Sequence, residues 1–286
     1  MLTRLPANVH TFVLQSWCFG IINGGVKNGD VLILCGGQGT RFQGEGELRP
    51  KPLIEIGGKP ILWHIMKYYS HFGFRRFVLG LGYRSEEFKR YFYDYRLLAH
   101  DLTLWLNPNI PPKIHAPSEE DHWEVVCVDT GLETLKGARI RRLLPHIQSD
   151  AFHLTYGDGL SNVDLAALDA FHRSHGKIGT VTAVRPPSRF GEMEIDGDRV
   201  LTFEEKPQLS RGFINGGFFI FQKEFMEFLS EDPLCDLEFG ALKNLAAKGE
   251  LMTFKHDGYW QCMDTIRDKE YLEKLWQRKA APWKVW

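Results

Sequence analysis

The sequence predicts an α/β protein with a Rossmann-like, mixed but mainly parallel sheet, helices on both faces, and a mixed-sheet C-terminal portion. Two observations predict this class. Apolar, strand-like runs alternate with helix-like segments from Val31 to Val184, which is typical of parallel βαβ units. Beyond about residue 190, short strand patterns instead follow one another across Gly/Asp turns.

The individual elements follow from periodicity and from turn residues. The run Val31–Cys35 is apolar and ends at a glycine, which indicates a buried strand. Lys59–Phe72 is predicted to be a helix, because Pro60 suits a first turn and apolar residues then repeat at helical spacing. The other predicted strands are Phe77–Leu81, Glu124–Val128, Ala151–Tyr156, Ile178–Val184, Glu192–Ile195, Val200–Glu204 and Phe213–Phe221. The other predicted helices are Ser85–Tyr95, Ile140–Ile147, Leu165–Phe171, Glu224–Leu229 and Glu238–Lys248.

Composition excludes several classes of protein and of partner. The 286 residues carry 35 Lys and Arg against 36 Asp and Glu, a net charge of -1, which argues against nucleic acid or an anionic membrane as partner. No apolar run is long enough to span a bilayer. The five cysteines are odd in number and scattered, which favours a reducing cytoplasm.

One domain boundary and one long loop can be predicted. Residues 1–30 form an N-terminal extension of unknown role, because polar residues interrupt its apolar stretch and so argue against a signal peptide. Residues 31–286 form one domain. The Pro-rich segment Asn107–His122 is long for a loop inside a domain, so a lid, a subunit contact and a plain excursion all remain open.

The first glycine-rich turn follows the first strand, in Leu34-Cys35-Gly36-Gly37-Gln38-Gly39-Thr40-Arg41. Three glycines in four residues can present bare N–H groups to a phosphate, and Arg41 adds a fixed positive charge. No Gly-Lys-Ser/Thr follows, and no third glycine occurs at dinucleotide spacing, so neither of those phosphate-binding motifs applies. A glycine turn without a ligand is the alternative.

Further charged residues stand next to prolines and glycines. In Arg49-Pro50-Lys51-Pro52 the prolines hold Lys51 in an extended segment, where its ammonium group suits a phosphate oxygen. Asp158 follows the strand that ends at Tyr156, and magnesium takes few protein carboxylates, so Asp158 with Asp264 is a candidate Mg²⁺ pair. Lys206 lies in a second Pro-flanked segment. The glycines after Asn215 indicate either a close ligand or a bulge.

Taken in order, the motifs resemble a known family. They are LCGGQGTRF, RPKPLIEIGGKPILWHIMKYYS, VDTG, YGDG, RFGEMEI, EEKP, INGGFFIF, MDT and APWKVW. Together they resemble the sugar-phosphate nucleotidyltransferases from about Val31 to Trp286, and RPKP, IGGKPILWHIM, VDTG and MDT resemble their cytidylyl branch. The resemblance implies the nucleotidyltransferase fold. It also implies conversion of CTP and α-D-glucose 1-phosphate to CDP-glucose and pyrophosphate with Mg²⁺, in a homo-oligomer that serves lipopolysaccharide O-antigen synthesis.

The resemblance also implies a role for each matching residue. Arg41, Lys51 and Asp158 are the implied catalytic residues, and Asp158 and Asp264 the implied metal ligands. The implied sugar-phosphate site comprises Lys206, Asn215 and Gly216. The implied nucleotide site comprises Leu34, Cys35, Gly36, Gly37, Gln38, Gly39, Thr40, Arg41, Lys51, Asp129, Thr130, Gly131, Thr134, Arg139 and Gly157.

One motif departs from the family pattern, and three other functions compete. Where the family usually has Thr-Gly-Gly-Arg, this chain has Lys136-Gly137-Ala138-Arg139, which places a methyl group and a charge near the implied base pocket. The competing functions are a nucleotidyltransferase for another base or sugar, a glycosyltransferase that uses Asp158 for its metal, and a non-catalytic paralogue that binds sugar nucleotides. The glycine turn with Arg41 and Lys51 argues against the glycosyltransferase, which needs no triphosphate site.

Overall fold

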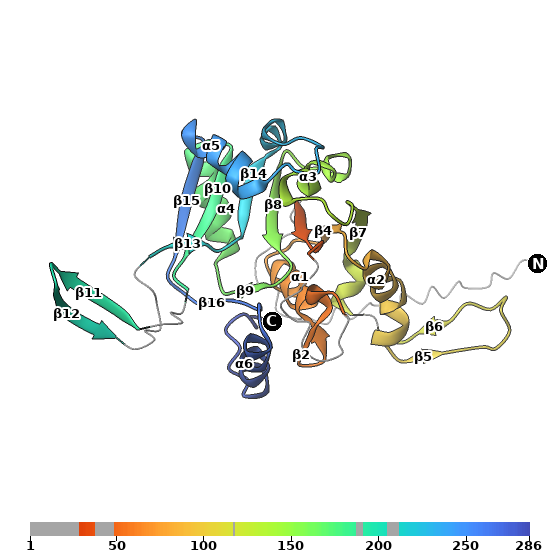
Figure 1. Cartoon of the computed structure of the whole chain (residues 1–286). Coiled ribbons are helices and arrows are strands. Elements are labelled where there is room, and N and C mark those ends of the chain that lie inside the picture. Colours follow the sequence, from red (N-terminus) through yellow and green to blue (C-terminus); the bar gives the residue numbers. More distant parts are fainter. Residues whose placement is uncertain (1–28, 38–48, 117, 187–190, 205–211) are drawn as a thin grey trace, which may run out of the picture.

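The structure is a computed structural model that describes residues 29–37, 49–116, 118–186, 191–204 and 212–286. Its centre is an eight-stranded sheet in the order β13-β10-β14-β8-β1-β4-β7, in which β15 also pairs with β10 (Figure 1). Its strands are β1 (Asp30–Leu34), β4 (Arg76–Leu81), β7 (Glu124–Asp129), β8 (Ala151–Tyr156), β10 (Gly179–Val184), β13 (Ile214–Asn215), β14 (Phe219–Gln222) and β15 (Leu251–His256).

One half of this sheet is parallel and the other is mixed. Strands β8, β1, β4 and β7 run parallel, whereas β14 is antiparallel to both β8 and β10. Leu34 lies opposite Gly80 on one side and Tyr156 on the other. Just beyond, Cys35 N–H donates to Gly80 O at 2.9 Å and Gly157 N–H donates to Leu34 O at 3.1 Å. The carboxyl ends of β1, β4 and β8 therefore meet, which is where open α/β sheets bind ligands.

Helices cover both faces of the sheet, so the predicted fold class is confirmed. Val31 and Ile33 belong to one hydrophobic core, and Leu32 and Leu34 to another, because successive side chains of a strand point to opposite faces. Helices α1, α2, α4 and α6 contribute to the first core, and α3 and α5 to the second. Their bounds are α1 (Ile61–His71), α2 (Ser85–Ala99), α3 (Lys136–Arg141), α4 (Leu165–His175), α5 (Lys243–Ala247) and α6 (Ile266–Gln277).

Some predicted helices differ in length or kind. The helix predicted through Ile147 ends at Arg141 and is followed by the short 3₁₀ helix η4 (Leu144–His146), because Pro145 has no N–H to continue the helical hydrogen bonds. Two others differ in kind: the helix predicted at Glu224–Leu229 is the 3₁₀ helix η5 (Lys223–Phe228), and that predicted at Glu238–Lys248 begins as a π-helical turn, η6 (Leu237–Leu242).

The strand predicted at Phe213–Phe221 is interrupted. Strand β10 pairs with β13 through Ala183 opposite Asn215, and with β14 through Thr180 opposite Ile220. The chain thus uses five steps from Asn215 to Ile220 where β10 uses three, so two residues bulge out. The bulge includes Gly217 at φ 75° and Phe218 at φ 49°. A continuous strand was therefore wrong, and the two glycines belong to a bulge.

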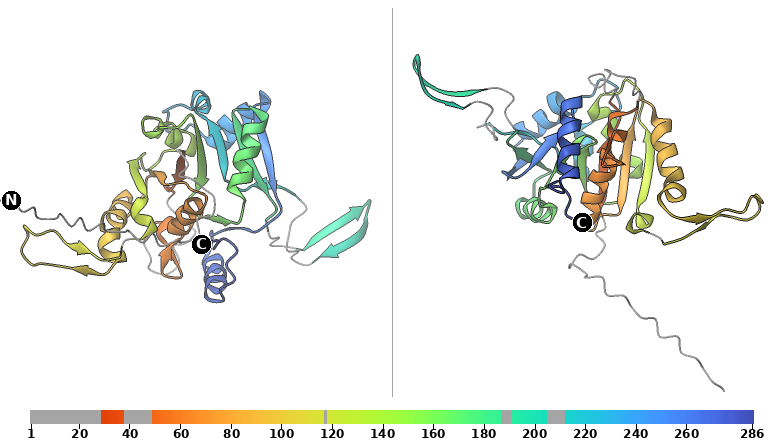
Figure 2. Two further views of the ribbon diagram at one scale, coloured as in Figure 1. Left: turned by 180° about the vertical axis from the view of Figure 1, so that it is seen from behind. Right: turned by 90° about the horizontal axis from the view of Figure 1, so that it is seen from below.

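Two hairpins project from the molecule. They are β5 (Leu102–Thr103) with β6 (Lys113–Ile114), and β11 (Glu192–Asp196) with β12 (Arg199–Glu204). Figure 2 shows both reaching away from the sheet. The long segment Asn107–His122 therefore contributes to a projecting arm and does not cover the sheet as a lid.

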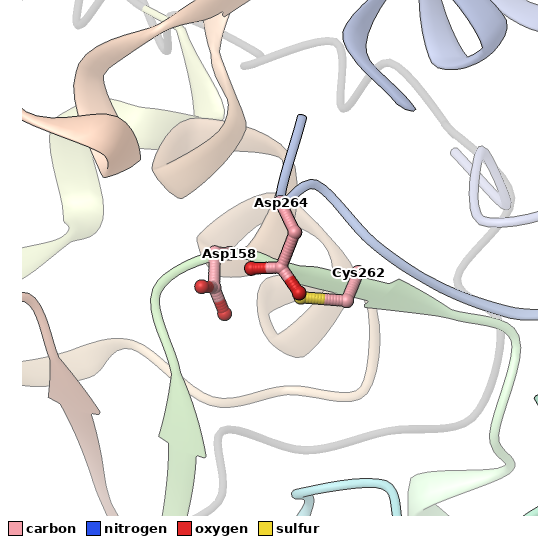
Figure 3. Close-up of side chains that lie close together, drawn as sticks. All are labelled: Asp158, Cys262 and Asp264. Atoms are coloured by element: carbon pink, nitrogen blue, oxygen red, sulfur yellow. The ribbon is translucent and has the colours of Figure 1, made fainter. Parts of the chain in front are cut away.

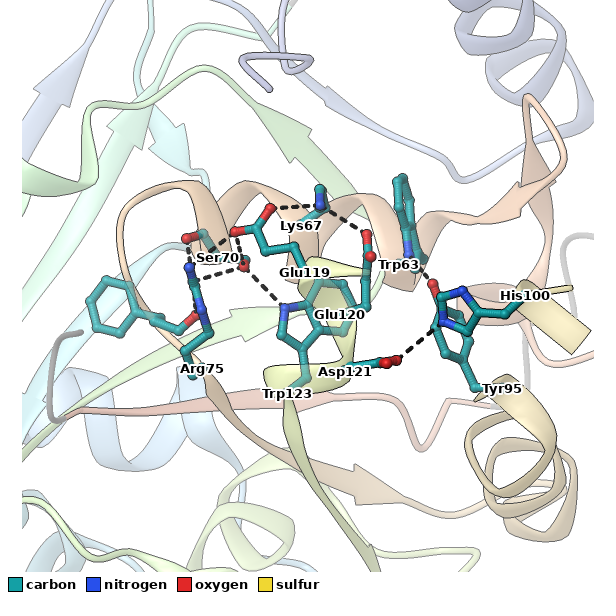
Figure 4. Close-up of polar contacts among 11 residues, drawn as sticks. Trp63, Lys67, Ser70, Arg75, Tyr95, His100, Glu119, Glu120, Asp121 and Trp123 are labelled. Atoms are coloured by element: carbon teal, nitrogen blue, oxygen red, sulfur yellow. Dashed lines mark hydrogen bonds and ion pairs between the residues drawn. The ribbon is translucent and has the colours of Figure 1, made fainter. Parts of the chain in front are cut away.

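A polar cluster ties the base of the first arm to α1 (Figure 4). Lys67 Nζ contacts Glu119 at 2.8 Å and Glu120 at 2.9 Å, both from the 3₁₀ helix η3 (Glu119–His122). Trp123 donates its indole N–H to Ser70 Oγ at 3.0 Å. Burial disfavours the two carboxylates, but the hydrogen bonds and the charge of Lys67, together with further hydrogen bonds, outweigh it and lower the pKa of both. This cluster fixes where the arm leaves the body.

The sequence predicted neither the six-residue strand β15 nor the helix α6, nor six strands of two or three residues, of which the β5–β6 pair is described above. Strand β2 (Glu55–Ile56) pairs with β3 (Lys59–Pro60), so α1 begins only at Ile61. Strand β9 (Gly159–Ser161) pairs with β16 (Trp260–Cys262), which brings the C-terminal part of the chain beside the end of β8. Among the described residues, no helix combines the length and apolar character that crossing a bilayer requires.

The C-terminal residues pack against a buried histidine on α1. The rings of Trp276, Trp283 and Trp286 surround the imidazole of His64. His64 Nε2 lies 2.8 Å from the carbonyl oxygen of Ile56, and its Nδ1 lies 3.4 Å from the indole nitrogen of Trp283. A carbonyl accepts and an indole N–H donates, so these partners assign the neutral form protonated on Nε2. Burial lowers the pKa of His64 to about 4.

Acid is therefore expected to destabilise the protein through His64. The pKa of His64 is lower in the folded protein than in the unfolded chain. The contribution of neutral, buried His64 to the free energy of unfolding is therefore complete above pH 6.5, and it is lost as the pH falls from 6.5 to about 4. The loss amounts to about 3 kcal/mol. The free energy of unfolding, measured by urea titration at each pH, should show His64→Gln destabilising at pH 7 and much less so near pH 4. His71→Gln, an exposed histidine on the same helix, controls for the substitution. A pH-independent difference for His64→Gln would contradict the assignment.

Candidate active site

A cavity of about 520 Å³ opens at the carboxyl ends of β1 and β8. Strand β1 and the turn after it contribute residues 34–37, and β8 and the residues after it contribute 156–158. Distant parts of the chain complete the lining with Lys51, Pro52, Lys136, Arg139, Asn215, Glu238, Trp260, Cys262 and Asp264.

Three charged residues that the sequence singled out meet in this cavity. Lys51 Nζ donates to Asp158 Oδ2 at 2.6 Å and to Asp264 Oδ1 at 2.5 Å. Lys51 opens the 3₁₀ turn η2 (Lys51–Leu53) directly after Pro50, so the predicted extended segment was wrong, because prolines also suit the first turn of a helix. Figure 3 shows Asp158 and Asp264 pointing toward each other from separate segments, with Cys262 beside them. The predicted cluster of one lysine and two aspartates therefore exists in the fold.

The two aspartates are held by backbone contacts that the β9–β16 pairing creates. Met263 N–H donates to the carbonyl of Asp158 at 2.9 Å, which joins the two loops. Asp264 N–H donates to Asp268 Oδ2 at 3.0 Å, and the same carboxylate forms a capping box with Thr265 at the start of α6. The position of Asp264 is thus set by the first turn of a helix.

Electrostatics keep Lys51 charged and Cys262 neutral. Burial disfavours the ammonium form of Lys51, but the charge of Asp158 and hydrogen bonds to Asp158 and Asp264 outweigh it and raise the pKa of Lys51. Burial raises the pKa of the Cys262 thiol, and the charge of Asp158 raises it further. Lys51 is therefore an ammonium and Cys262 a thiol at neutral pH.

The residues present fit a divalent ion. Oxygen atoms of Asp158 and Asp264 and the sulfur of Cys262 lie within 4.8 Å of one another. The two carboxylates already share one cation, the ammonium of Lys51. Two carboxylates suit Mg²⁺, which fills its remaining positions with water and substrate phosphates, whereas a protonated thiol is a poor ligand for so hard an ion.

A second cation, Arg139, lies beneath the glycine turn. Its side chain is 4% exposed. Nη1 donates to Leu81 O at 2.6 Å and to Thr130 Oγ1 at 2.5 Å, and Nη2 donates to Thr134 O at 2.9 Å. Burial lowers the pKa of Arg139, yet a guanidinium stays charged in proteins. These neutral partners orient a positive charge at the floor of the cavity.

Position 36 must be a glycine, because the side chain of Arg139 occupies the space that a Cβ would need. A Cβ added to Gly36 would lie 2.1 Å from Arg139 Cζ, whereas one added to Gly37 would meet nothing within 4 Å. We expect Gly36→Ala to displace Arg139 from its buried hydrogen bonds and to destabilise the protein by about 2 to 3 kcal/mol. Thermal unfolding measures this, and Gly37→Ala is the matched control. Equal melting temperatures for the two variants would contradict the packing described.

The structure places the sequence-predicted residues in two layers. Of them, Leu34, Cys35, Gly36, Gly37, Lys51, Arg139, Gly157, Asp158, Asn215 and Asp264 line the cavity. Thr130 and Thr134 lie behind Arg139 and bond to it, and Asp129 accepts from Ser85 Oγ at 3.1 Å and from Gly131 N–H at 3.1 Å. Gly216 is buried beside the cavity, where its carbonyl accepts from Trp260 at 2.8 Å. Gln38, Gly39, Thr40, Arg41 and Lys206 lie outside the described residues.

Sequence reasoning missed several residues of the lining. Tyr156 belongs to the motif YGDG, and Cys262 directly precedes the motif MDT, but neither motif implies a role for these two residues. Lys136 was noticed only as a departure from the family pattern. Glu238 and Trp260 lie outside every motif, and they reach the cavity through η6 and through β16. No local signal marks such residues, because their role depends on packing between distant segments.

Comparison with known proteins now gives the class of protein that this fold and cavity define. The family model described as Nucleotidyl transferase matches residues 30–268. The chain therefore belongs to the nucleotidyl transferase family, and it is an enzyme of that family.

The particular branch follows from individual relatives. The chain is 44% identical over 256 residues to the glucose-1-phosphate cytidylyltransferases of Salmonella typhi and Salmonella typhimurium, covering 89% of this chain and 98% of each relative. This confirms the resemblance to the cytidylyl branch. Among solved structures, HddC from Yersinia pseudotuberculosis matches with a TM-score of 0.60 and 25% identity, over 86% of this chain and 99% of that one.

Proposed function

We propose that the protein transfers a cytidylyl group from CTP to α-D-glucose 1-phosphate, giving CDP-glucose and pyrophosphate. The observation that carries the proposal is the meeting of Lys51, Asp158 and Asp264 in a cavity beside a glycine turn. The names of the Salmonella relatives support the choice of base and sugar.

The reaction needs charge neutralisation more than proton transfer. A phosphate oxygen of the hexose phosphate bonds to the α-phosphorus of CTP, while the bond from that phosphorus to the leaving pyrophosphate breaks. A phosphate monoester has a second pKa of about 6, so the nucleophile is already ionised at neutral pH and needs no general base. The obstacle is repulsion between two polyanions, which cations and in-line positioning overcome.

The residues of this chain supply those cations. Lys51 would neutralise the α-phosphate, and Arg139 would face the nucleotide from the floor of the cavity. The N–H groups of the glycine turn would bind phosphate oxygens. We also propose that Arg41 contributes to the triphosphate site and Lys206 to the sugar phosphate, as their motifs imply. The end of β7 and the loop that leads to α3 would hold Arg139 in place for the nucleotide. The residues concerned are Asp129, Thr130, Gly131 and Thr134.

Asp158 and Asp264 would hold Mg²⁺. When bound, this ion supplies charge neutralisation and orientation to the phosphates. In the structure Lys51 occupies the space between the same two carboxylates, so Lys51 would turn toward the nucleotide as the carboxylates take up the ion.

A pyrophosphate-release assay tests the proposal. It crosses CTP, UTP, dTTP, GTP and ATP with several hexose 1-phosphates in the presence of Mg²⁺. Release is expected only from CTP with glucose 1-phosphate. Equal turnover of UTP would indicate a nucleotidyltransferase of broader base choice. An absence of release from every pair would instead favour the glycosyltransferase or the non-catalytic paralogue.

We further propose that the enzyme works in the cytoplasm as a homo-oligomer. The four described cysteines, Cys35, Cys127, Cys235 and Cys262, are free thiols, which suits a reducing compartment. Both projecting hairpins expose large apolar side chains, among them Leu106 at 100% and Phe203 at 61%, and such surfaces are typical of subunit contacts. Light scattering coupled to gel filtration tests this, and a monomer at micromolar concentration would contradict it.

A further inference from the structure

A chain of hydrogen bonds runs along one wall of the cavity. Lys136 Nζ and the Tyr156 hydroxyl both contact Oε1 of Glu238, the hydroxyl at 3.0 Å. Asn215 Nδ2 donates to the same hydroxyl at 3.1 Å. All four side chains line the cavity, and they come from α3, β8, η6 and β13. The chain thus joins four segments that are distant in sequence.

The direction of these bonds is fixed by chemistry. A carboxylate only accepts, so the Tyr156 proton points at Glu238 and the phenol oxygen is left to accept from Asn215. At its other end, Asn215 Oδ1 accepts from Gly217 N–H at 2.9 Å. Both ends of the amide are therefore held. Its second N–H and second lone pair remain for a ligand in the cavity.

The aromatic ring of Tyr156 is held independently of its hydroxyl. It packs edge-on against Phe219 at a centroid distance of 5.9 Å, and Lys136 Nζ lies 5.0 Å from its centre. A Cβ on Gly217 would lie 3.2 Å from Tyr156 Cδ2, so the absence of a side chain at this position leaves room for the ring. Tyr156→Phe therefore removes the hydroxyl while keeping the ring in place.

We propose that Glu238 is a positioning residue, which orients the Asn215 amide toward the hexose phosphate through the hydroxyl of Tyr156. The inference rests on the proposed function together with the role in the sugar-phosphate site that the family resemblance implies for Asn215. Glu238 belongs to the π-helical turn η6, and such turns often occur at functional sites. Lys136 stands where the family usually has threonine, and its ammonium holds the carboxylate of Glu238 at this position.

Steady-state kinetics test whether Glu238 and Tyr156 contribute to binding of the hexose phosphate. Tyr156→Phe and Glu238→Ala should each raise the KM for the hexose phosphate about 5- to 20-fold and change the KM for the nucleotide less than twofold. Because both residues act through Asn215, adding Tyr156→Phe to Asn215→Ala should cause no further loss. Tyr93→Phe, at an 87% exposed tyrosine on α2, is the matched control. Additive losses, or equal effects on both substrates, would overturn the proposal.

A second measurement needs no turnover. The side-chain NH₂ signals of Asn215, identified in ¹⁵N spectra by their loss in Asn215→Ala, should shift in Tyr156→Phe and in Glu238→Ala. Unchanged signals would overturn the proposal whatever the kinetics show. Shifted signals with an unchanged hexose phosphate KM would also overturn it, since the amide would move without consequence. If the wild type releases no pyrophosphate from any pair, the proposed function fails, while the NMR signals still decide whether Glu238 positions Asn215.

Discussion

Replacing Asp158 by asparagine is expected to lower kcat by about 100- to 1000-fold with little loss of stability. The substitution keeps the shape of the side chain and removes one of the two negative charges that hold a cation in the cavity. Asp158 is partly exposed to the cavity, so the neutral amide can remain solvated there. Pyrophosphate release at saturating substrates measures kcat, and thermal unfolding measures stability.

The binding of Mn²⁺, followed by electron paramagnetic resonance, separates a metal ligand from a general structural role. Asp158→Asn should weaken Mn²⁺ binding, because one carboxylate of the pair is lost. Asp198→Asn, at the exposed turn between β11 and β12, is the control for the same chemical change. Near-normal kcat in Asp158→Asn would defeat the assignment of this residue to the catalytic site.

Replacing Lys51 by alanine is expected to lower kcat by a similar factor, about 100- to 1000-fold. The ammonium is the cation nearest to both carboxylates, at 2.5 and 2.6 Å, and we propose that it neutralises the α-phosphate in the transition state. Lys51→Met, which keeps most of the aliphatic stem, should lose as much activity as Lys51→Ala. The measurement is again pyrophosphate release, with Lys243→Ala on the exposed side of α5 as the control.

The two variants differ in their effect on metal binding. Lys51 competes with a divalent ion for Asp158 and Asp264, so Lys51→Met should bind Mn²⁺ more tightly than the wild type, whereas Asp158→Asn should bind it less tightly. Turnover within threefold of the wild type in Lys51→Met would remove this lysine from the mechanism. Weaker Mn²⁺ binding in that variant would contradict the shared carboxylate pair.

Local sequence was sufficient for the parts of the site that depend on local backbone geometry. The glycine turn after β1, the lysine between two prolines and the Asp158 that follows β8 were all predicted, because each sits where its neighbours restrict the chain. The parallel strands β1, β4, β7 and β8 were predicted from their apolar runs, which are typical of strands in a covered sheet. Even the split of Phe213–Phe221 carried a signal, in Gly216 and Gly217.

Local sequence was insufficient where two backbone conformations have similar propensities and tertiary packing determines which one forms. Six short strands escaped prediction, because two- and three-residue strands have too few residues for a periodicity. The longer strand β15 and the helix α6 were missed as well. The π-helical start of the helix that carries Glu238 also escaped. A helix was predicted at Glu238–Lys248, but apolar spacing does not distinguish the i→i+5 hydrogen bonds of its first turn from ordinary i→i+4 hydrogen bonds.

What the sequence alone determined is the class of the fold and the chemical groups at the ends of its strands. Only the tertiary structure decided that Lys51 lies between Asp158 and Asp264, and that Glu238 reaches Asn215 through Tyr156. The physical reason is that hydrophobic periodicity and turn residues act within a few residues of chain. The contacts of the cavity join segments up to 213 residues apart, and the packing of both cores against one sheet brings those segments together.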